Sequence, residues 1–265
     1  MLPNVLFGLA LIVSSLFIQP LSATFQDSTD DPAGQSEINT GNNRCHTPGL
    51  AEHYVLALSW QPAFCEQHRD KPECRVTDPD AWQTTHFTLH GLWPNQPDCG
   101  TRYSFCGSVK QSQHDFCKYP PVPFRDAGTL SKLGQYMPAA AYGSCLQRHE
   151  WFKHGTCQTT RNADEYFNTA MRLQQDFNNR IAPFMAQNIA KTMTTESFFA
   201  LVDQAFGSDA HRRLKISCSS GNLVSVYINL PTRLDQNDMG SLIQQADPDF
   251  YNGCGARFRV DAIGQ

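Results

Sequence analysis

The sequence predicts a single α+β domain in which helices flank a central antiparallel sheet and disulfides fasten the fold. Short strand patterns and longer helical patterns both occur between residue 45 and the C-terminus. Ten cysteines, an even number, indicate a disulfide framework. No internal repeat and no interdomain linker divides this part of the chain, so we expect one domain over residues 45–265.

The N-terminus has the pattern of a secretory signal peptide. An apolar run over residues 5–18 is followed by a helix breaker and by Ala23, a small residue suited to cleavage, which predicts a signal peptide over residues 1–23. The run is short for a membrane span, but no Lys or Arg precedes Arg44, so a retained anchor is the alternative. Residues 24–44 are polar and predict a flexible leader.

The overall charge excludes a protein that coats nucleic acid through a basic surface. The formal net charge is -4 at pH 7. A polyanionic substrate must therefore be attracted by a local group of cations. Export would bring the cysteines into an oxidising compartment, where they form disulfides. Zinc sites are the alternative, but no Cys-x-x-Cys pair occurs.

The first predicted strand covers residues 53–60, a mostly apolar run that suits a strand buried on both faces. Residues 61–63, Gln-Pro-Ala, are predicted to end it. The polar loop that follows contains Cys65 and Cys74, a natural local pair.

The second predicted strand covers residues 85–89 and leads directly into His90 and Gly91. A histidine at a strand end followed by glycine suits a cleft, because glycine lets another group approach the backbone. Trp93 beside Pro94 offers a rigid aromatic plane. A core tryptophan and a structural histidine are the alternative interpretation of this stretch.

The middle of the chain begins with a loop and continues with helices. Residues 96–123 contain three cysteines and few apolar residues, so disulfides are needed there. Helices are predicted over residues 127–136 and over most of residues 139–154, with Gly155 ending the second.

Two longer amphipathic helices are predicted next. Apolar residues recur near helical spacing over residues 163–186, where Pro183 is predicted to kink or end the helix. The second helix covers residues 195–206, with Thr194 or Thr195 as its N-cap.

Three strands are predicted near the C-terminus. Residues 214–218 and 223–230 form two strands joined by Ser-Ser-Gly-Asn, which predicts a hairpin. A last strand is predicted over residues 257–261, and Cys218 and Cys254 are placed to tie this part of the sheet.

Four chemically active side chains lie close together in residues 148–157. On a helix, His149, Glu150, Lys153 and His154 are neighbours at i+3 and i+4 spacing and project within an arc of roughly 140°. One face would then carry two imidazoles, an anion and a cation. A solvated helix face with chance histidines is the simpler alternative.

This set of residues suits acid–base catalysis on a phosphate ester. Two histidines across a cleft can serve as general base and general acid, and a lysine can stabilise charge that develops on a phosphate. No Gly-x-Ser-x-Gly elbow, glycine-rich phosphate loop or His-Glu-x-x-His motif occurs. RNA fits, because its 2′-OH is a nucleophile next to the scissile phosphate. That reaction requires no metal.

Three segments resemble the T2 ribonuclease family. Residues 86–94 (HFTLHGLWP) and 149–157 (HEWFKHGTC) resemble its two active-site segments, and residues 55–65 (VLALSWQPAFC) resemble its first core strand. The resemblance runs from Tyr54 to the C-terminus. The export signal, the even cysteine count and the lack of Asn-x-Ser/Thr sequons resemble the bacterial periplasmic or secreted branch.

The resemblance implies a catalytic role for each of five residues. His154 would be the general base that takes the proton of the ribose 2′-OH, and His90 the general acid that protonates the departing 5′-oxygen. Lys153 and Glu150 would surround the pentacovalent phosphate, and His149 would hold the phosphate.

The resemblance also implies that Trp93 and Asn95 contact the base. Trp93 would stack on it, which is a sequence-tolerant contact. Adenine-preferring members carry Asp just after the Trp-Pro pair, whereas this chain has Asn95, whose amide offers donors as well as acceptors. We therefore expect little base specificity.

The resemblance implies two disulfides, Cys106–Cys157 between the two active-site segments and Cys218–Cys254 in the C-terminal sheet. Two more pairs are expected beside them, Cys65–Cys74 and Cys117–Cys145. These leave Cys45 with Cys99.

The sequence thus predicts an exported endoribonuclease, periplasmic or secreted, that cleaves single-stranded RNA by metal-independent transesterification through 2′,3′-cyclic phosphates. We expect a monomer with no cofactor, no metal, no obligate protein partner and no membrane contact after signal cleavage.

Two other interpretations compete with this one. Cys145, His149, His154 and Cys157 have spacings that zinc ligands could have. The protein could also be a secreted RNA-binding module that keeps the fold without catalysis, although such a module would be expected to lose at least one of the catalytic residues.

Overall fold

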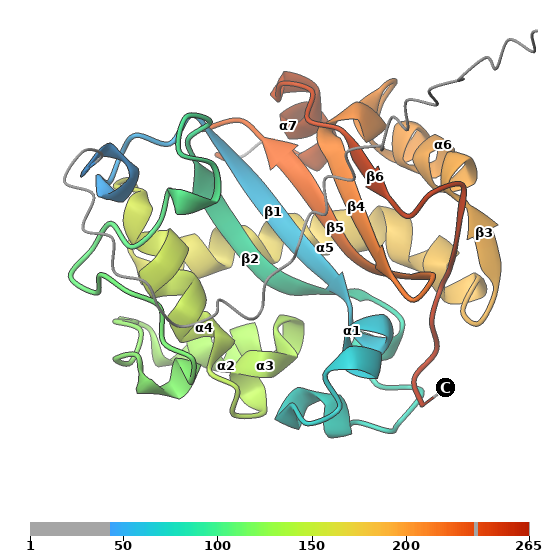
Figure 1. The fold of residues 1–265 in the computed structure, drawn as a ribbon, viewed down its shortest axis with the longest axis horizontal. Helices are drawn as coiled ribbons and strands as arrows, with labels where there is room; N and C mark the ends of the chain where they lie inside the picture. Colours follow the sequence, from blue (N-terminus) through green and yellow to red (C-terminus); the bar gives the residue numbers. More distant parts are fainter. Residues whose placement is uncertain (1–42, 236–237, 265) are drawn as a thin grey trace, which may run out of the picture. The chain divides into compact units, whose positions relative to one another are not determined.

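The fold is organised around a seven-stranded sheet, seen face-on in Figure 1. The structure is a computed structural model that describes residues 43–235 and 238–264. Its main strand order is β2-β1-β5-β4-β6, and β7 pairs with both β3 and β5. The strands are β1 (His53–Trp60), β2 (Phe87–Asn95), β3 (Thr192–Thr194), β4 (Leu214–Ser219), β5 (Asn222–Leu230), β6 (Tyr251–Gly253) and β7 (Arg257–Arg259).

The centre of the sheet is antiparallel, as predicted, and two short strands make the sheet as a whole mixed. The central strands β2, β1, β5 and β4 are antiparallel to their neighbours, as predicted. The short strand β6 lies parallel to β4, and β7 meets β5 in parallel. The three-residue strands β3 and β6 were not predicted, because three residues are too few to show the alternating pattern of a strand.

Helices cover one face of the sheet and flank its ends. They are α1 (Gln61–Gln67), α2 (Ala127–Tyr136), α3 (Pro138–Ala141), α4 (Leu146–His149), α5 (Ala163–Gln187), α6 (Thr195–Phe206) and α7 (Met239–Gln245). Figure 1 shows α5 crossing behind the sheet. Its buried Phe177 and Ile181 share one apolar core with Leu56 and Leu58 of β1 and Phe198 of α6. Among the described helices, none is long and apolar enough to cross a membrane.

Several predicted elements are confirmed closely. Strand β1 and helices α2 and α6 have the predicted bounds, and Thr194 caps α6 by accepting a hydrogen bond from the Ser197 backbone. Helix α5 continues past Pro183 to Gln187, so the proline does not end it. The predicted signal peptide, residues 1–23, and residues 24–42 of the predicted leader lie outside the described residues.

The structure tests two predicted strand ends. Only the second was misplaced, since β1 does end at Trp60 as predicted, and residues 61–63 begin α1, where Pro62 occupies an early helical position that needs no N–H donor. Strand β2 does not stop at residue 89 but continues to Asn95 through Gly91 and Pro94. Such residues are tolerated because β2 lies at one end of the main strand order, where Pro94 needs no further partner.

The segment over residues 139–154 is not one helix. After α3, Cys145 takes a left-handed backbone conformation with φ 55°, and α4 starts anew at Leu146. Helix α4 runs into a π-helical turn, η6 (Glu150–His154), and then into the 3-10 turn η7 (Gly155–Cys157). Gly155 has φ -57°, so it continues the helical path and does not end it.

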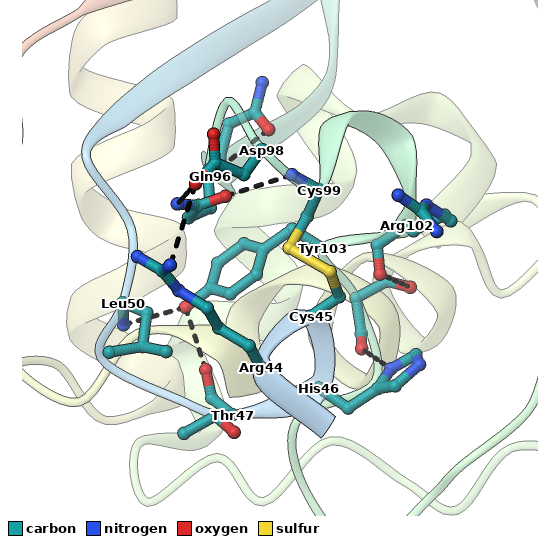
Figure 2. Close-up of a disulfide and its surroundings, with 12 residues drawn as sticks. Arg44, Cys45, His46, Thr47, Leu50, Gln96, Asp98, Cys99, Arg102 and Tyr103 are labelled. Atoms are coloured by element: carbon teal, nitrogen blue, oxygen red, sulfur yellow. Dashed lines mark hydrogen bonds and ion pairs between the residues drawn. A yellow bond between two sulfur atoms is a disulfide. The ribbon is translucent and has the colours of Figure 1, made fainter. Parts of the chain in front are cut away.

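Five disulfides join the ten cysteines: Cys45–Cys99, Cys65–Cys74, Cys106–Cys157, Cys117–Cys145 and Cys218–Cys254. Figure 2 shows the first of them, which fastens the start of the described chain to the loop that follows β2. Beside it, the Tyr103 hydroxyl donates to a carbonyl oxygen of Thr47 and accepts from the Leu50 backbone. Arg44 forms an ion pair with Asp98 in the same view.

Side chains of α5 hold the first residue of β2. The Phe87 backbone N–H donates to Asn178 Oδ1 at 2.9 Å, and the Phe87 carbonyl accepts from Asn178 Nδ2 and Gln174 Nε2, both at 2.8 Å. All of these groups are buried, so each backbone group needs a protein partner. The amides thereby fix the position of β2 against the core.

We expect Asn178→Ala to lower the free energy of unfolding by about 1–3 kcal/mol, because the buried Phe87 N–H would lose its acceptor. Urea titration followed by circular dichroism measures this change. Asn179→Ala is the matched control, since Asn179 is the next residue of α5 and is exposed. Equal stability of the two variants would contradict the proposed clamp.

Candidate active site

A β-bulge places His90 within strand β2. Leu58 of β1 pairs with Leu89 and Ala57 pairs with Gly91, so His90 is the extra residue on the bulged strand. Bulges of this kind redirect a side chain, and they occur often beside active sites. His90 is therefore aimed from inside the strand, and not from a strand end as the sequence suggested.

The π-helical turn η6 brings His149 and His154 onto one side of the helix. The Gly155 N–H donates to the carbonyl of Glu150 five residues earlier, as well as to that of Trp151. In this geometry, residues five apart lie one above the other. The two imidazole centroids are accordingly 6.1 Å apart. Single π-turns inside helices are rare and are frequent at functional sites.

The Glu150 carboxylate joins the two segments. Its side chain is fully buried, and the Trp93 indole N–H donates to Oε2 at 2.7 Å. His90 Nε2 lies 3.6 Å from Oε1. A buried carboxylate is tolerated only when donors or cations compensate for its lost hydration, so Trp93 and His90 stabilise it.

Gly91 provides the space for this carboxylate. A Cβ atom on Gly91 would lie 1.9 Å from Glu150 Oε2 and 2.5 Å from Trp93 Nε1. Any side chain at residue 91 would therefore displace the Glu150–Trp93 pair. The expectation that Gly91 lets another group approach the strand is confirmed, and the approaching group is Glu150.

Trp93 also holds the imidazole of His154. The two rings stack with centroids 5.1 Å apart and an interplanar angle of 25°. The His90 ring meets the same indole edge-on at 5.3 Å, and Tyr227 of β5 packs against it at 5.8 Å. The two candidate acid–base histidines thus contact a single indole ring, one at its face and one at right angles to it. Its role in stacking on a base remains a prediction.

His149 lies on an aromatic support that the sequence did not reveal. Its ring stacks on Phe116 at 4.2 Å and meets Tyr119 edge-on at 6.0 Å. The Cys117–Cys145 disulfide ties this loop to the start of α4. Phe116 sits in a loop without periodicity, so only its place next to a cysteine could have drawn attention to it.

The electrostatics of the site favour the neutral form of His149 and of His154. Burial, together with the Lys153 ammonium and His90, lowers the pKa of His149 to about 3. Burial, Lys153, His149 and His90 hold the pKa of His154 well below the usual histidine value. Nδ1 of His149 and Nδ1 of His154 are buried and find no hydrogen-bond partner among the described residues. Buried polar atoms without a hydrogen-bond partner are frequent where a substrate binds.

Lys153 is held through its backbone. Its carbonyl oxygen accepts a hydrogen bond from the Phe105 N–H at 2.8 Å. Phe105 has φ 53°, a conformation that costs energy for a residue with a side chain, and its neighbour Cys106 is bonded to Cys157. This contact fixes the π-turn against the loop that follows Tyr103.

The only potential metal-binding group among the described residues is His149, Glu150 and His154, whose ligand atoms lie within 4.8 Å of one another. The zinc set that included Cys145 and Cys157 is wrong, because both cysteines are in disulfides. A metal at the remaining three residues would use the same atoms that acid–base catalysis requires.

The structure brings together six of the seven predicted site residues: His90, Trp93, His149, Glu150, Lys153 and His154. Asn95 lies apart from them at the end of β2, where its carbonyl oxygen accepts from the Glu52 N–H. Its side-chain Oδ1 accepts from the Gln96 N–H at 2.8 Å. Asn95 therefore lies at the margin of the cluster.

The site combines a buried carboxylate with neighbouring histidines on a disulfide-linked α+β fold. This combination is typical of enzymes that work by acid–base catalysis. The chain belongs to the Ribonuclease T2 family, whose model matches residues 51–240. It is accordingly a T2-type endoribonuclease.

Individual relatives agree with this assignment. The chain is 29% identical to Ribonuclease I of Escherichia coli (strain K12) over 242 residues, which are 82% of this chain and 88% of the relative. It is 26% identical to Ribonuclease Rh of Rhizopus niveus over 225 residues, 78% and 83% of the two chains. The crystal structure of RNase NT in complex with 5′-AMP shares the fold, with a TM-score of 0.51, 20% identity and coverage of 80% and 99%.

We expect Trp93→Phe to lower kcat by roughly tenfold to a hundredfold, because the buried Glu150 carboxylate would lose a charge-assisted hydrogen bond worth about 1.5–3 kcal/mol. Steady-state kinetics on a dinucleoside phosphate measures this. Phenylalanine keeps an aromatic surface, so a role limited to base stacking would leave kcat nearly unchanged. Trp82→Phe is the control, since Trp82 stacks on His86 outside the cluster.

We expect the acid limb of the kcat/KM profile to have its midpoint below pH 6.5, the ordinary histidine value. A general base works in its deprotonated form, and the lowered pKa of His154 keeps it deprotonated at lower pH. Lys153→Gln should move this midpoint upward, since it removes a cation that lowers the pKa of His154. Rates measured between pH 3 and pH 8 test both statements, and a wild-type midpoint at or above 6.5 would disprove the first.

Proposed function

We propose that the protein is an exported endoribonuclease that cleaves single-stranded RNA by metal-independent transesterification, with 2′,3′-cyclic phosphates as intermediates. The observation that carries the proposal is the placement of His90 and His154 against one indole ring, beside the buried Glu150. Two imidazoles that flank one reaction centre can exchange protons with the attacking and leaving oxygens of a phosphate ester.

In the proposed reaction, neutral His154 takes the proton from the ribose 2′-OH as this oxygen attacks the phosphorus. The bond from phosphorus to the 5′-oxygen breaks, and His90 gives that oxygen a proton. The products are a 2′,3′-cyclic phosphate and a free 5′-OH. Water then opens the cyclic phosphate with the two roles exchanged, which leaves a 3′-phosphate. The lowered pKa of His154 supports its role as the base.

The remaining residues would stabilise the pentacovalent phosphate. Lys153 supplies a positive charge next to both helix histidines. His149 is neutral in the free protein because of its low pKa, so it would bind a phosphate oxygen as an N–H donor and not as a cation. Glu150 would orient His90 and Trp93 through its two oxygens.

We also propose that the protein acts in the periplasm or outside the cell as a monomer, without an obligate protein partner. The apolar run over residues 5–18 and the pairing of all ten cysteines in disulfides support export to an oxidising compartment.

Base specificity is proposed to be low, with a small preference set by Asn95. Its side-chain oxygen is engaged by the Gln96 N–H, so its amide nitrogen is the group left for a base. Two N–H donors favour a base edge that offers acceptors, such as O6 and N7 of guanine or O4 of uracil. The preference for these bases over the others should be small, since stacking is sequence-tolerant.

The decisive experiment measures cleavage of dinucleoside phosphates by the oxidised protein in excess EDTA, with products identified by mass. We expect 2′,3′-cyclic phosphates from several base pairs. His90→Ala and His154→Ala should each lower kcat at least about a hundredfold, whereas His86→Ala, in the same segment but outside the cluster, should not. Loss of activity in EDTA would favour a metal at His149, Glu150 and His154. A folded wild-type protein without activity would favour the RNA-binding module.

A separate prediction concerns Asn95→Asp. A carboxylate only accepts hydrogen bonds, so the variant should shift the preference toward bases with an exposed amino group, adenine and cytosine. The ratio of kcat/KM values for adenine and guanine dinucleoside phosphates measures this, and we expect it to rise roughly tenfold, in line with about 1–3 kcal/mol for a good base contact. An unchanged ratio would remove Asn95 from base recognition.

A further inference from the structure

A second cavity lies at the end of the sheet opposite to β2. It has a volume of about 650 Å³ and is lined by residues of α6, by the 3-10 turn η8 (Ala210–Arg213) and by the turn between β6 and β7. In Figure 1, α6 and β6 lie on the far side of the sheet from β2. A cavity of this size is typical of small-ligand sites. It shares no residue with the catalytic cluster.

The cavity contains an aspartate–histidine pair that the catalytic mechanism does not use. Both oxygens of Asp203 accept from His211 Nδ1, at 2.9 and 2.8 Å, and Oδ1 also accepts from the His211 backbone N–H at 2.9 Å. The carboxylate fixes the orientation of the imidazole and places the Nδ1 proton toward Asp203. Nε2, on the opposite side of the ring, points away from Asp203 and donates to an anionic ligand when the ring carries both protons.

An exposed aromatic group stands beside this pair. His211 stacks on Phe199 with centroids 5.4 Å apart, and Phe250 meets Phe199 at 5.3 Å and His211 at 6.0 Å. Phe250 is 50% exposed, more than any other large hydrophobic residue that the described part of the chain presents to solvent. Packing alone would have buried it. Exposed rings next to cations are the usual platform for the bases of single-stranded nucleic acids.

The opposite wall of the cavity is preformed. Asn252 accepts from the Cys254 N–H and donates to the Gly255 carbonyl, and Thr195 donates to that same carbonyl at 2.7 Å. The Cys218–Cys254 disulfide fastens this turn to β4. Arg257, at the start of β7, lines the cavity and is exposed. A rigid wall lowers the entropic cost of binding a ligand there.

We propose that this cavity is a second nucleotide-binding site. The phosphate would lie between His211 and Arg257, and the base would stack on Phe250, which does not line the cavity but contacts the lining residues Phe199 and His211. Glu196 also lines the cavity, and Asp203 is already engaged by His211, so Arg257 and His211 are the lining groups that would contact a phosphate. A nucleotide combines the planar ring and the phosphate that these groups accept. It comes either as a free mononucleotide or as one unit of an RNA chain outside the cleaved bond.

The test uses 2′-deoxyadenosine 5′-monophosphate and a deoxyadenosine octamer, which lack the 2′-OH and so cannot be cleaved by the proposed chemistry. Nuclear magnetic resonance of the full oxidised protein follows the amides of Asn252, Gly255 and Ala256. We expect these amides to shift with the mononucleotide in the wild type, and the shift to be lost in Phe250→Ala and reduced in His211→Gln. Tyr142→Ala is the matched control, since Tyr142 is a similarly exposed aromatic residue away from this cavity.

The octamer identifies the source of the nucleotide. If the site takes a unit of RNA, Phe250→Ala should weaken octamer binding roughly tenfold, the usual effect of losing one stacked base. If octamer binding is unchanged while the mononucleotide still shifts the amides, the site takes free nucleotides. No shift of these amides in the wild type with either ligand would overturn the proposal.

The cleavage assay tests the nuclease proposal independently of the second site. A dinucleoside phosphate is too short to reach both sites. Its rate of cleavage should therefore be the same in the wild type and in Phe250→Ala. The identification of RNA as the polymer rests on the proposed function, but binding of the deoxynucleotides requires no catalysis. Failure of cleavage and failure of binding can therefore be told apart.

Discussion

The arrangement of the active site depends on burying one carboxylate, that of Glu150. A charged group without water must be surrounded by donors or cations, and this chain supplies the Trp93 indole N–H and the His90 imidazole from a strand about sixty residues away in sequence. The same requirement explains Gly91, since any side chain there would occupy the space of the carboxylate. Through Trp93, the constraint extends to His154, whose ring stacks on the indole. One buried charge thus sets the relative positions of His90, His154 and the strand that carries His90.

The sequence predicted the parts of the fold whose pattern is local. Strand β1 is a continuous apolar run and α6 has a regular apolar stripe with a threonine cap, so their bounds could be predicted closely. Strand β2 could not be followed past residue 89, because Gly91 and Pro94 are local strand breakers that only an end position in the sheet tolerates. The short strands β3 and β6 are formed by their partners and carry too few residues for a period of their own.

For the site, the sequence predicted which residues come together, Asn95 apart, but not how they meet. An ordinary helix was expected to carry His149 and His154 on a broad face. The structure has a π-turn there. A local sequence pattern does not show whether a backbone N–H donates to the fourth or to the fifth preceding residue. Tertiary contacts decide it: a Cβ on Gly155 would lie 2.5 Å from the Trp151 ring, and Cys157 is bonded to Cys106. Phe116 was missed because stacking between a loop and a helix leaves no periodic signal.

The link between Phe105–Cys106 and Lys153–Cys157 has a consequence for the life of the enzyme in the cell that makes it. The π-turn is held by one backbone hydrogen bond and one disulfide to a loop far away in the sequence. A nascent chain in a reducing compartment lacks that disulfide, so one of the two links that fix Lys153 and its neighbours is missing. We expect such a chain to be latent. If the protein is exported as proposed, its full activity would then develop only after it reaches an oxidising compartment, where the disulfide can form.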